Sequence, residues 1–170
     1  MEASIRDQRD EFEQTVRAYS ADLYRYGYWL SRDRFTAEEL VQETFARAWA
    51  SWPELRDIKV VKQWLITILR NERARMFASK ALPLADEDVH ELEIPHPTGV
   101  AEDLDLRRRI ERLPLSYREP LLLQVLGGFS CAEIASMLET SEGAIMTRLT
   151  RARQSLRDDD AAPARLKAAT

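Results

Sequence analysis

Three arginines near the C-terminal end of the chain carry the clearest chemical signature. Arg148, Arg151 and Arg153 lie within six residues, in a stretch with helical periodicity. A guanidinium group donates paired hydrogen bonds to guanine or phosphate, and an α-helix fits the major groove of DNA. A solvated helical face with local acidic partners is the alternative. The compact three-helix pattern around these residues, with a short turn at 139–141, favours DNA binding.

Residue types that catalyse reactions or bind metals form no recognisable pattern. The two histidines, His90 and His96, lie in a proline-rich acidic segment and are expected to be solvated loop residues. The sequence contains no glycine-rich phosphate loop and no metal-ligand spacing. Cys131 is expected to be a small buried side chain, with a redox sensor as the alternative. We therefore expect no enzymatic activity, no metal and no cofactor.

The N-terminal half segregates charge between neighbouring helical stretches. Residues 33–54 contain five acidic residues and two arginines, with glutamates clustered around Gln42. Residues 56–80 contain seven basic residues and two acids. Such segregation suits a protein held between one basic partner and one polyanionic partner.

Aromatic residues accompany the basic stretch. Rings interleaved with cations are suited to unpaired DNA, because bases stack on them whatever the sequence. Trp49 and Trp64 occupy apolar positions and are more typical of a core, whereas the position of Trp52 stays open. The loop at 53–59 is a candidate pocket for an extruded base.

Composition and periodicity predict an all-α fold that positions these groups. Hydrophobic residues make up 45% of the chain, glycines number five and β-branched runs are short. A break near Asp22 and a separate short turn before residue 61 are left open. Helices are expected at about 8–31, 37–51, 60–79, 101–113, 117–126, 131–138 and 142–157.

Three capping boxes mark expected helix starts, in which a hydroxyl accepts from a backbone N–H and a glutamate reaches back. They begin at Thr36, Ser116 and Ser130. Gly127 and Gly128 are expected to end the helix before them.

The faces of the last helix follow from its periodicity. The side facing the bundle should comprise Ile145, Leu149, Ala152 and Leu156. The remaining surface should comprise Ala144, Thr147, Arg148 and Arg151 on one side, with Met146, Thr150 and Arg153 on the opposite shoulder.

The helices are expected to form two small domains, 8–80 and 107–157, joined by an acidic linker at 81–106 and followed by a frayed tail at 158–170. The linker holds eight acidic residues and no basic one. The N-terminus is too charged for a signal peptide, and no apolar run is long enough to span a bilayer. We expect a cytoplasmic protein without membrane insertion.

Three segments, taken in order, resemble the sigma factors of bacterial RNA polymerase, in particular the small extracytoplasmic-function (ECF) group. AEELVQETFARAW (37–49) resembles the polymerase-binding helix, and KQWLITILRNERARMF (62–77) resembles the helix that recognises and opens the minus-10 element. Residues 113–157 resemble the helix-turn-helix domain that reads the minus-35 element. The resemblance covers about residues 10–157, and three motifs in the right order and spacing make it highly specific.

The resemblance implies roles for individual residues in the N-terminal domain. Glu39, Gln42 and Glu43 would contact the coiled coil of the polymerase β′ subunit. Asn71 would read the upstream edge of the minus-10 element, and the loop at 53–60 would accept a flipped base. The minus-10 contacts as a whole would comprise Lys59, Lys62, Trp64, Arg70, Asn71, Arg73 and Arg75.

The resemblance also implies roles in the C-terminal domain and for the linker. Base-contacting positions of the minus-35 helix would be Met146, Thr147, Thr150 and Arg151, with Arg148 and Arg153 on or near the DNA backbone. Met146 stands where the family often has lysine or arginine, and Thr150 stands where some members carry an aromatic residue. The acidic linker would thread through the polymerase cleft as a mimic of nucleic acid.

The implied partners are core RNA polymerase (β′ and β), promoter DNA of stress-response genes and an anti-sigma factor, which in this family is often membrane-bound. Two other functions remain to be weighed. A two-domain helix-turn-helix regulator would need a sensor domain, but residues 1–80 show a charged helical pattern instead. A sigma-mimicking adaptor that traps an anti-sigma factor need not keep DNA-facing arginines, and this chain has them.

Overall fold

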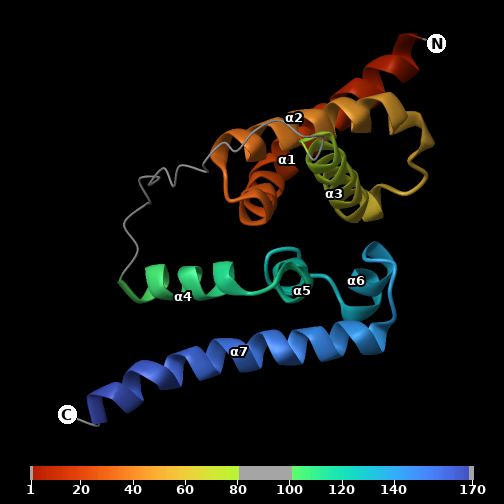
Figure 1. Ribbon diagram of the computed structural model, residues 1–170. Helices are drawn as coiled ribbons and strands as arrows, with labels where there is room; N and C mark the ends of the chain where they lie inside the picture. The colour runs from red at the N-terminus through yellow and green to blue at the C-terminus, as the bar shows by residue number, and fades with distance from the viewer. Residues whose placement is uncertain (1, 81–100, 169–170) are drawn as a thin grey trace. The chain divides into compact units, whose positions relative to one another are not determined.

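The computed structural model describes the backbone of residues 2–80 and 101–168, and side chains within 6–78 and 105–158. Every regular element in this part of the chain is helical (Figure 1), which confirms the predicted all-α fold. The chain divides into one unit that ends at Ala85 and a second that begins at Asp86. Residues 81–100, which hold most of the predicted linker, lie outside the described residues.

The first unit consists of three α-helices that all contact one another. Helix α1 is continuous, without the break considered near Asp22. A separate short turn does precede the third helix. The elements are α1 (Glu2–Ser31), α2 (Arg34–Ser51), the 3₁₀ turns η1 (Trp52–Glu54) and η2 (Ile58–Val60), and α3 (Val61–Lys80).

The core of this unit lies where the apolar stripes of the three helices meet. Each helix contributes residues at three-to-four spacing, as the sequence pattern predicts. Full burial of one leucine side chain contributes roughly 1.5–3 kcal/mol. The fully or almost fully buried side chains include Leu23, Tyr26, Leu30, Leu40, Leu65 and Leu69.

A cluster of aromatic rings joins α1, α2, η1 and α3. Phe12 contacts both Trp49 and Trp52 at 5.0 Å between ring centroids, and Trp52 lies 6.1 Å from Trp64. Trp52 is buried, whereas Trp49 is 46% exposed. The prediction that Trp49 is a core residue is therefore only half right. Its ring contacts Phe12, and almost half of the residue is exposed to solvent.

The turn between α1 and α2 differs from the predicted capping box at Thr36. Arg32 adopts a left-handed conformation with φ of 59°, which reverses the chain after α1. Asp33 then caps α2, and its Oδ2 accepts from the backbone N–H of Thr36 at 2.6 Å. Aspartate is a strong N-cap residue, so α2 begins at Arg34 and Thr36 lies inside its first turn.

The second unit consists of four helices, with α7 contacting each of the other three. Its core centres on Leu123, Ile134, Ile145 and Leu149, which are almost completely buried. The inward face predicted for the last helix is confirmed for Ile145, Leu149 and Ala152, which are buried, whereas Leu156 is half-buried. The helices are α4 (Ala101–Arg112), α5 (Leu115–Val125), α6 (Cys131–Met137) and α7 (Glu142–Ala168).

Two predicted helix ends in this unit are wrong. Helix α5 starts at Leu115 rather than after Ser116, because Pro114 occupies the N-cap position and its carbonyl accepts from Tyr117 and Arg118 at 2.9 Å. Helix α7 continues to Ala168, so residues predicted as a frayed tail extend the last helix.

The third predicted capping box, at Ser130, is confirmed. The Ser130 hydroxyl accepts from the backbone N–H of Glu133 at 3.3 Å, and the Glu133 carboxylate accepts from the Ser130 backbone N–H at 2.8 Å. The Ser130 hydroxyl also donates to that carboxylate at 2.7 Å. The backbone and hydroxyl donors of Ser130 together lower the pKa of Glu133.

Removal of this cap by Ser130→Ala is expected to lower the free energy of unfolding by about 1 kcal/mol at neutral pH. Because the pKa of Glu133 is lower in the folded state, its contribution is present above the unfolded pKa and is lost as pH falls through the folded pKa. Urea denaturation at pH 7 and in acid should show that the free energies of unfolding of wild type and Ser130→Ala differ less in acid. Equal differences at both pH values would contradict the contribution of Glu133.

Candidate nucleic-acid and protein interfaces

The acidic residues predicted to bind a protein partner share one surface of α2. Glu39, Gln42 and Glu43 stand at positions i, i+3 and i+4, which are neighbours on a helix, and all three are exposed. No hydrogen bond or ion pair within residues 6–78 engages their side chains. This surface is therefore available to a partner without the loss of an internal contact.

The cations of α3 and the preceding turn differ in how the fold holds them. Lys59 lies exposed in η2, whereas Lys62 pairs with Asp22 of α1 at 3.3 Å. The guanidinium of Arg73 lies 4.7 Å from the ring centroid of Phe77, in a cation–π contact. Each of these contacts costs a cation some of its freedom to reach a ligand.

The other minus-10 candidates on α3 also differ in how exposed their side chains are. Asn71 is exposed, whereas Arg70 and Trp64 are half-buried. The Trp64 ring contacts Trp52 within the aromatic cluster described above. Of the minus-10 residues predicted on this helix, only Asn71 and Arg75 are therefore exposed.

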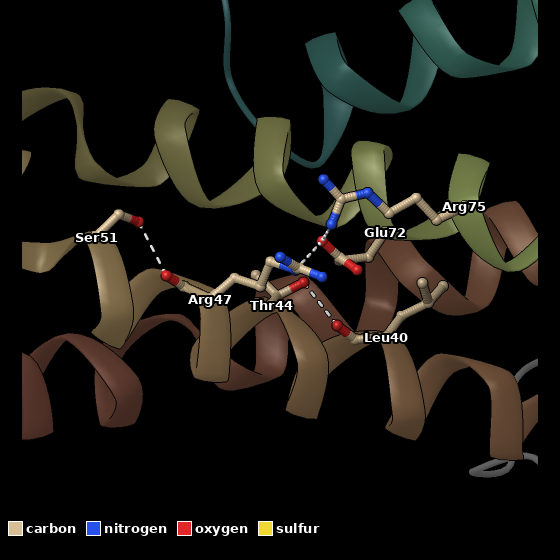
Figure 2. A network of polar contacts seen from close by, with 6 residues as sticks. All are labelled: Leu40, Thr44, Arg47, Ser51, Glu72 and Arg75. Atoms are coloured by element: carbon tan, nitrogen blue, oxygen red, sulfur yellow. Dashed lines mark hydrogen bonds and ion pairs between the residues drawn. The ribbon is translucent and has the colours of Figure 1, made fainter.

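A buried carboxylate joins α2 to α3 (Figure 2). Glu72 of α3 has only 7% of its side chain exposed, and its Oε1 accepts from Arg47 of α2 at 2.7 Å and from Arg75 at 3.0 Å. Both arginine side chains are more than half exposed. Beside them on α2, the buried Thr44 hydroxyl donates to the Leu40 carbonyl at 2.6 Å.

An open groove of about 500 Å³ runs along this network between α2 and α3. It brings together side chains that the sequence analysis assigned to different surfaces, namely Glu43 on α2 and Asn71 on α3. The lining comprises Glu43, Ala46, Arg47, Ala50, Ser51, Ile68, Asn71, Glu72 and Arg75.

The outer surface of α7 carries the predicted DNA-reading residues. Met146, Thr147, Thr150, Arg151 and Arg153 are exposed, and Arg148 is half-buried beside the core. The hydroxyls of both threonines donate to the carbonyls four residues earlier, at 2.9 and 2.8 Å. These side chains thus lie close to the helix, which allows close approach of a ligand.

Helix α5 holds two of the arginines of α7. Arg151 Nη1 donates to the Tyr117 hydroxyl at 3.4 Å, and Arg153 Nη2 donates to Gln124 Oε1 at 2.5 Å. The second contact draws Arg153 toward α5, which fits its predicted place on the shoulder of the helix.

Comparison with known proteins gives these surfaces a context. Residues 15–82 match the family Sigma-70 region 2, and residues 103–156 match the family Sigma-70, region 4. The ECF RNA polymerase sigma factor SigL of Mycobacterium tuberculosis is 30% identical over 146 residues, which cover 82% of this chain and 82% of SigL. This chain belongs to the ECF sigma factors.

Two further comparisons agree with this family. The ECF sigma factor SigE of Mycolicibacterium smegmatis is 31% identical over 157 residues, which cover 86% of this chain but only 60% of SigE. Among solved structures, the sigma factor RpoE of Bartonella quintana, in complex with the anti-sigma factor NepR, superposes with a TM-score of 0.74 at 28% identity. That superposition covers 87% of this chain and 95% of the other. The predicted family is confirmed.

Two residues of the Arg47–Glu72–Arg75 network were absent from the sequence-based prediction for this sigma factor. Arg47 follows Glu43 by four residues, so it resembles one half of a solvated ion pair on one helix. Glu72 carried a usable signal, because it stands on the apolar stripe of α3 between Leu69 and Met76. An acid on such a stripe is expected to be buried and paired.

Gln154 was also absent from the prediction. It is exposed on α7, one turn after Thr150, and its amide donates to Asp158 Oδ1 at 3.1 Å.

No group of three or more His, Cys, Asp or Glu residues in the described ranges could hold a metal ion. Within those ranges, no helix combines the length and apolar character that a membrane span requires.

Proposed function

We propose that this sigma factor directs core RNA polymerase to specific promoters in the cytoplasm and supports the opening of DNA at the start site. It has no chemical step of its own in this proposal, because polymerase performs the catalysis. Binding energy from polymerase and duplex contacts is used to stabilise the unpaired state of the minus-10 element.

The observation that carries the proposal is that one sigma-factor chain exposes two different surfaces, an acidic one on α2 and a basic one on α7. An exposed carboxylate surface on α2 is suited to a basic protein partner, and we assign Glu39, Gln42 and Glu43 to the β′ coiled coil. An exposed surface on α7 that mixes arginines with small side chains is suited to the major groove. We assign it to the minus-35 element.

We assign the minus-10 contacts to α3 and the turn before it. Asn71 is accessible and lies beside the cations that would bind the flanking phosphates. Lys62 and Arg73 would have to leave Asp22 and Phe77, respectively, or contact DNA from their present positions. Lys59 and the turn at 53–60 would receive a base that leaves the stack.

We also propose that an anti-sigma factor controls this chain. The support comes from the Bartonella quintana sigma factor RpoE, which was solved in complex with the anti-sigma factor NepR. The two-domain regulator is disfavoured by the match to sigma-70 region 2. The sigma-mimicking adaptor is disfavoured because exposed arginines remain on α7.

In-vitro transcription with core RNA polymerase and a library of random promoter sequences tests the proposal. We expect the purified chain to enrich a small set of sequences with two conserved elements, and core enzyme alone to enrich none. Failure of the chain to confer specific initiation on core enzyme would contradict the proposed function.

The Arg151→Ala variant tests the assignment of the α7 surface. We expect it to weaken holoenzyme binding to a selected promoter by about 1–3 kcal/mol, because a base contact is lost. Arg108→Ala, an exposed arginine of α4, serves as the control. If the loss is equal on promoter DNA and on unrelated duplexes, Arg151 contacts phosphate and the base assignment is wrong.

A further inference from the structure

We propose that Arg47 and Arg75, held by the buried Glu72, form a binding site for a backbone phosphate of the opened promoter strand. The inference rests on the proposed function and extends it to a residue of α2. It assigns Arg47 to DNA, although it lies on the helix that we assign to polymerase.

The first support is geometric. Both guanidinium groups contact the same carboxylate oxygen, Arg47 through Nε at 2.7 Å and Arg75 through Nη1 at 3.0 Å. Two cations that meet at one oxygen are close enough to contact a single phosphate group together. Figure 2 shows the two side chains reaching Glu72 from α2 and from α3.

The second support is the hydrogen-bonding capacity that remains. A guanidinium group has five N–H donors, and each arginine uses one nitrogen on Glu72. No other hydrogen bond or ion pair within residues 6–78 engages either guanidinium. Arginine binds phosphate well because its planar donors match the phosphate oxygens and because it is weakly hydrated.

The third support is preorganisation by a buried charge. The Glu72 side chain is 7% exposed, so its interaction with the two cations is screened less than a surface pair. It fixes the arginines in one place and reduces the rotamer entropy that a ligand contact would otherwise cost. Two cations on one anion leave a net positive charge beside Asn71.

Glu43 is the opposing charge that faces this site, because it lines the same groove. In the free protein it would repel a phosphate. In the proposed holoenzyme, the carboxylate of Glu43 is engaged by polymerase, and the net positive charge that Arg47, Arg75 and Glu72 leave is then no longer opposed by Glu43. Polymerase binding would therefore favour phosphate binding in the groove.

The alternative is that the ion pairs form a purely structural bridge between α2 and α3. Variants that remove a cation, compared with a variant that removes the anion, distinguish the phosphate site from such a bridge. Arg47→Gln and Arg75→Gln each remove a cation, whereas Glu72→Gln removes the anion and keeps both cations. Arg17→Gln, an exposed arginine on α1, is the control. The affinity of reconstituted holoenzyme for a promoter selected from the library is measured over a range of salt concentrations, together with core binding and thermal stability of each chain.

We expect Arg47→Gln and Arg75→Gln to weaken promoter binding about tenfold. Each should also lower the slope of log affinity against log salt by about one, because one phosphate contact is lost. Glu72→Gln should lower thermal stability but keep the wild-type slope, and Arg17→Gln should resemble wild type. This result would support the phosphate site.

Three results would overturn the inference. The first is an unchanged slope in both arginine variants. The second is a decrease in promoter affinity that follows thermal stability in all three variants, as a structural bridge requires. The third is a loss of core binding in Arg47→Gln that is as large as its loss of promoter binding, which would place Arg47 on polymerase instead. If wild-type holoenzyme selects no promoter, the proposed function fails first, which is a distinguishable outcome.

Discussion

Combined replacement of Gln42 by alanine and Glu43 by lysine is expected to weaken binding to core RNA polymerase strongly. Reversal of a charge at the centre of an electrostatic interface costs about 2–5 kcal/mol, which corresponds to at least a ~30-fold weaker Kd. Both side chains are exposed, and neither is engaged by a hydrogen bond or ion pair within residues 6–78. The fold should therefore be unaffected. Fluorescence anisotropy of the labelled chain titrated with core enzyme measures the Kd.

Glu11→Lys is the matched control, since it makes the same charge change at an exposed position of α1. We expect it to bind core enzyme as wild type does. Circular dichroism should give the same melting temperature for wild type and for the double variant. Wild-type affinity in a folded double variant would refute the assignment of the α2 surface to polymerase.

Replacement of Gly127 by alanine is expected to destabilise the second unit by about 3 kcal/mol, at the upper end of the range for overpacking. A Cβ atom at Gly127 would lie 2.4 Å from the carbonyl oxygen of Leu123 and 2.5 Å from the ring of Phe129. Neither group can move away cheaply, because one is backbone and the other is a buried ring. Urea denaturation measures the free energy of unfolding.

Gly143→Ala is the control for this substitution. Gly143 lies in the first turn of α7, and no atom lies within 4 Å of a Cβ built there. Because glycine is a poorer helix former than alanine by about 1 kcal/mol, we expect unchanged or slightly higher stability. Similar effects of Gly127→Ala and Gly143→Ala would mean that the close approach at Gly127 does not constrain the fold.

These glycines illustrate what a local pattern can and cannot predict. The Gly127–Gly128 pair correctly indicated a helix end. The sequence did not indicate that the two glycines act differently. Gly128 supplies a positive φ of 73°, whereas Gly127 supplies space for the Phe129 ring. The second role depends on a side chain that folds back onto α5, which periodicity does not report.

Helix starts also show where a local sequence pattern is sufficient and where it is not. Ser130 and Glu133 form a capping box because both partners lie within one turn, so the sequence pattern suffices. The same pattern at Thr36 and Ser116 was misleading. A stronger cap at Asp33 and the fixed backbone of Pro114 start those helices earlier. Competition between neighbouring caps is decided by the backbone turn that precedes each helix.

The sequence by itself determined the all-α fold, the inward faces of the helices and the family. These depend on residue spacing along one helix and on the order of motifs, which are local properties of the chain. Glu72 and Arg75 stand three residues apart on α3, so their pairing is local. Only the tertiary structure decided that Arg47 of α2 joins them. Their contact requires α2 and α3 to pack with one particular rotation. The burial of Glu72 and its contact with a second cation arise from that packing rather than from the spacing of residues in either helix.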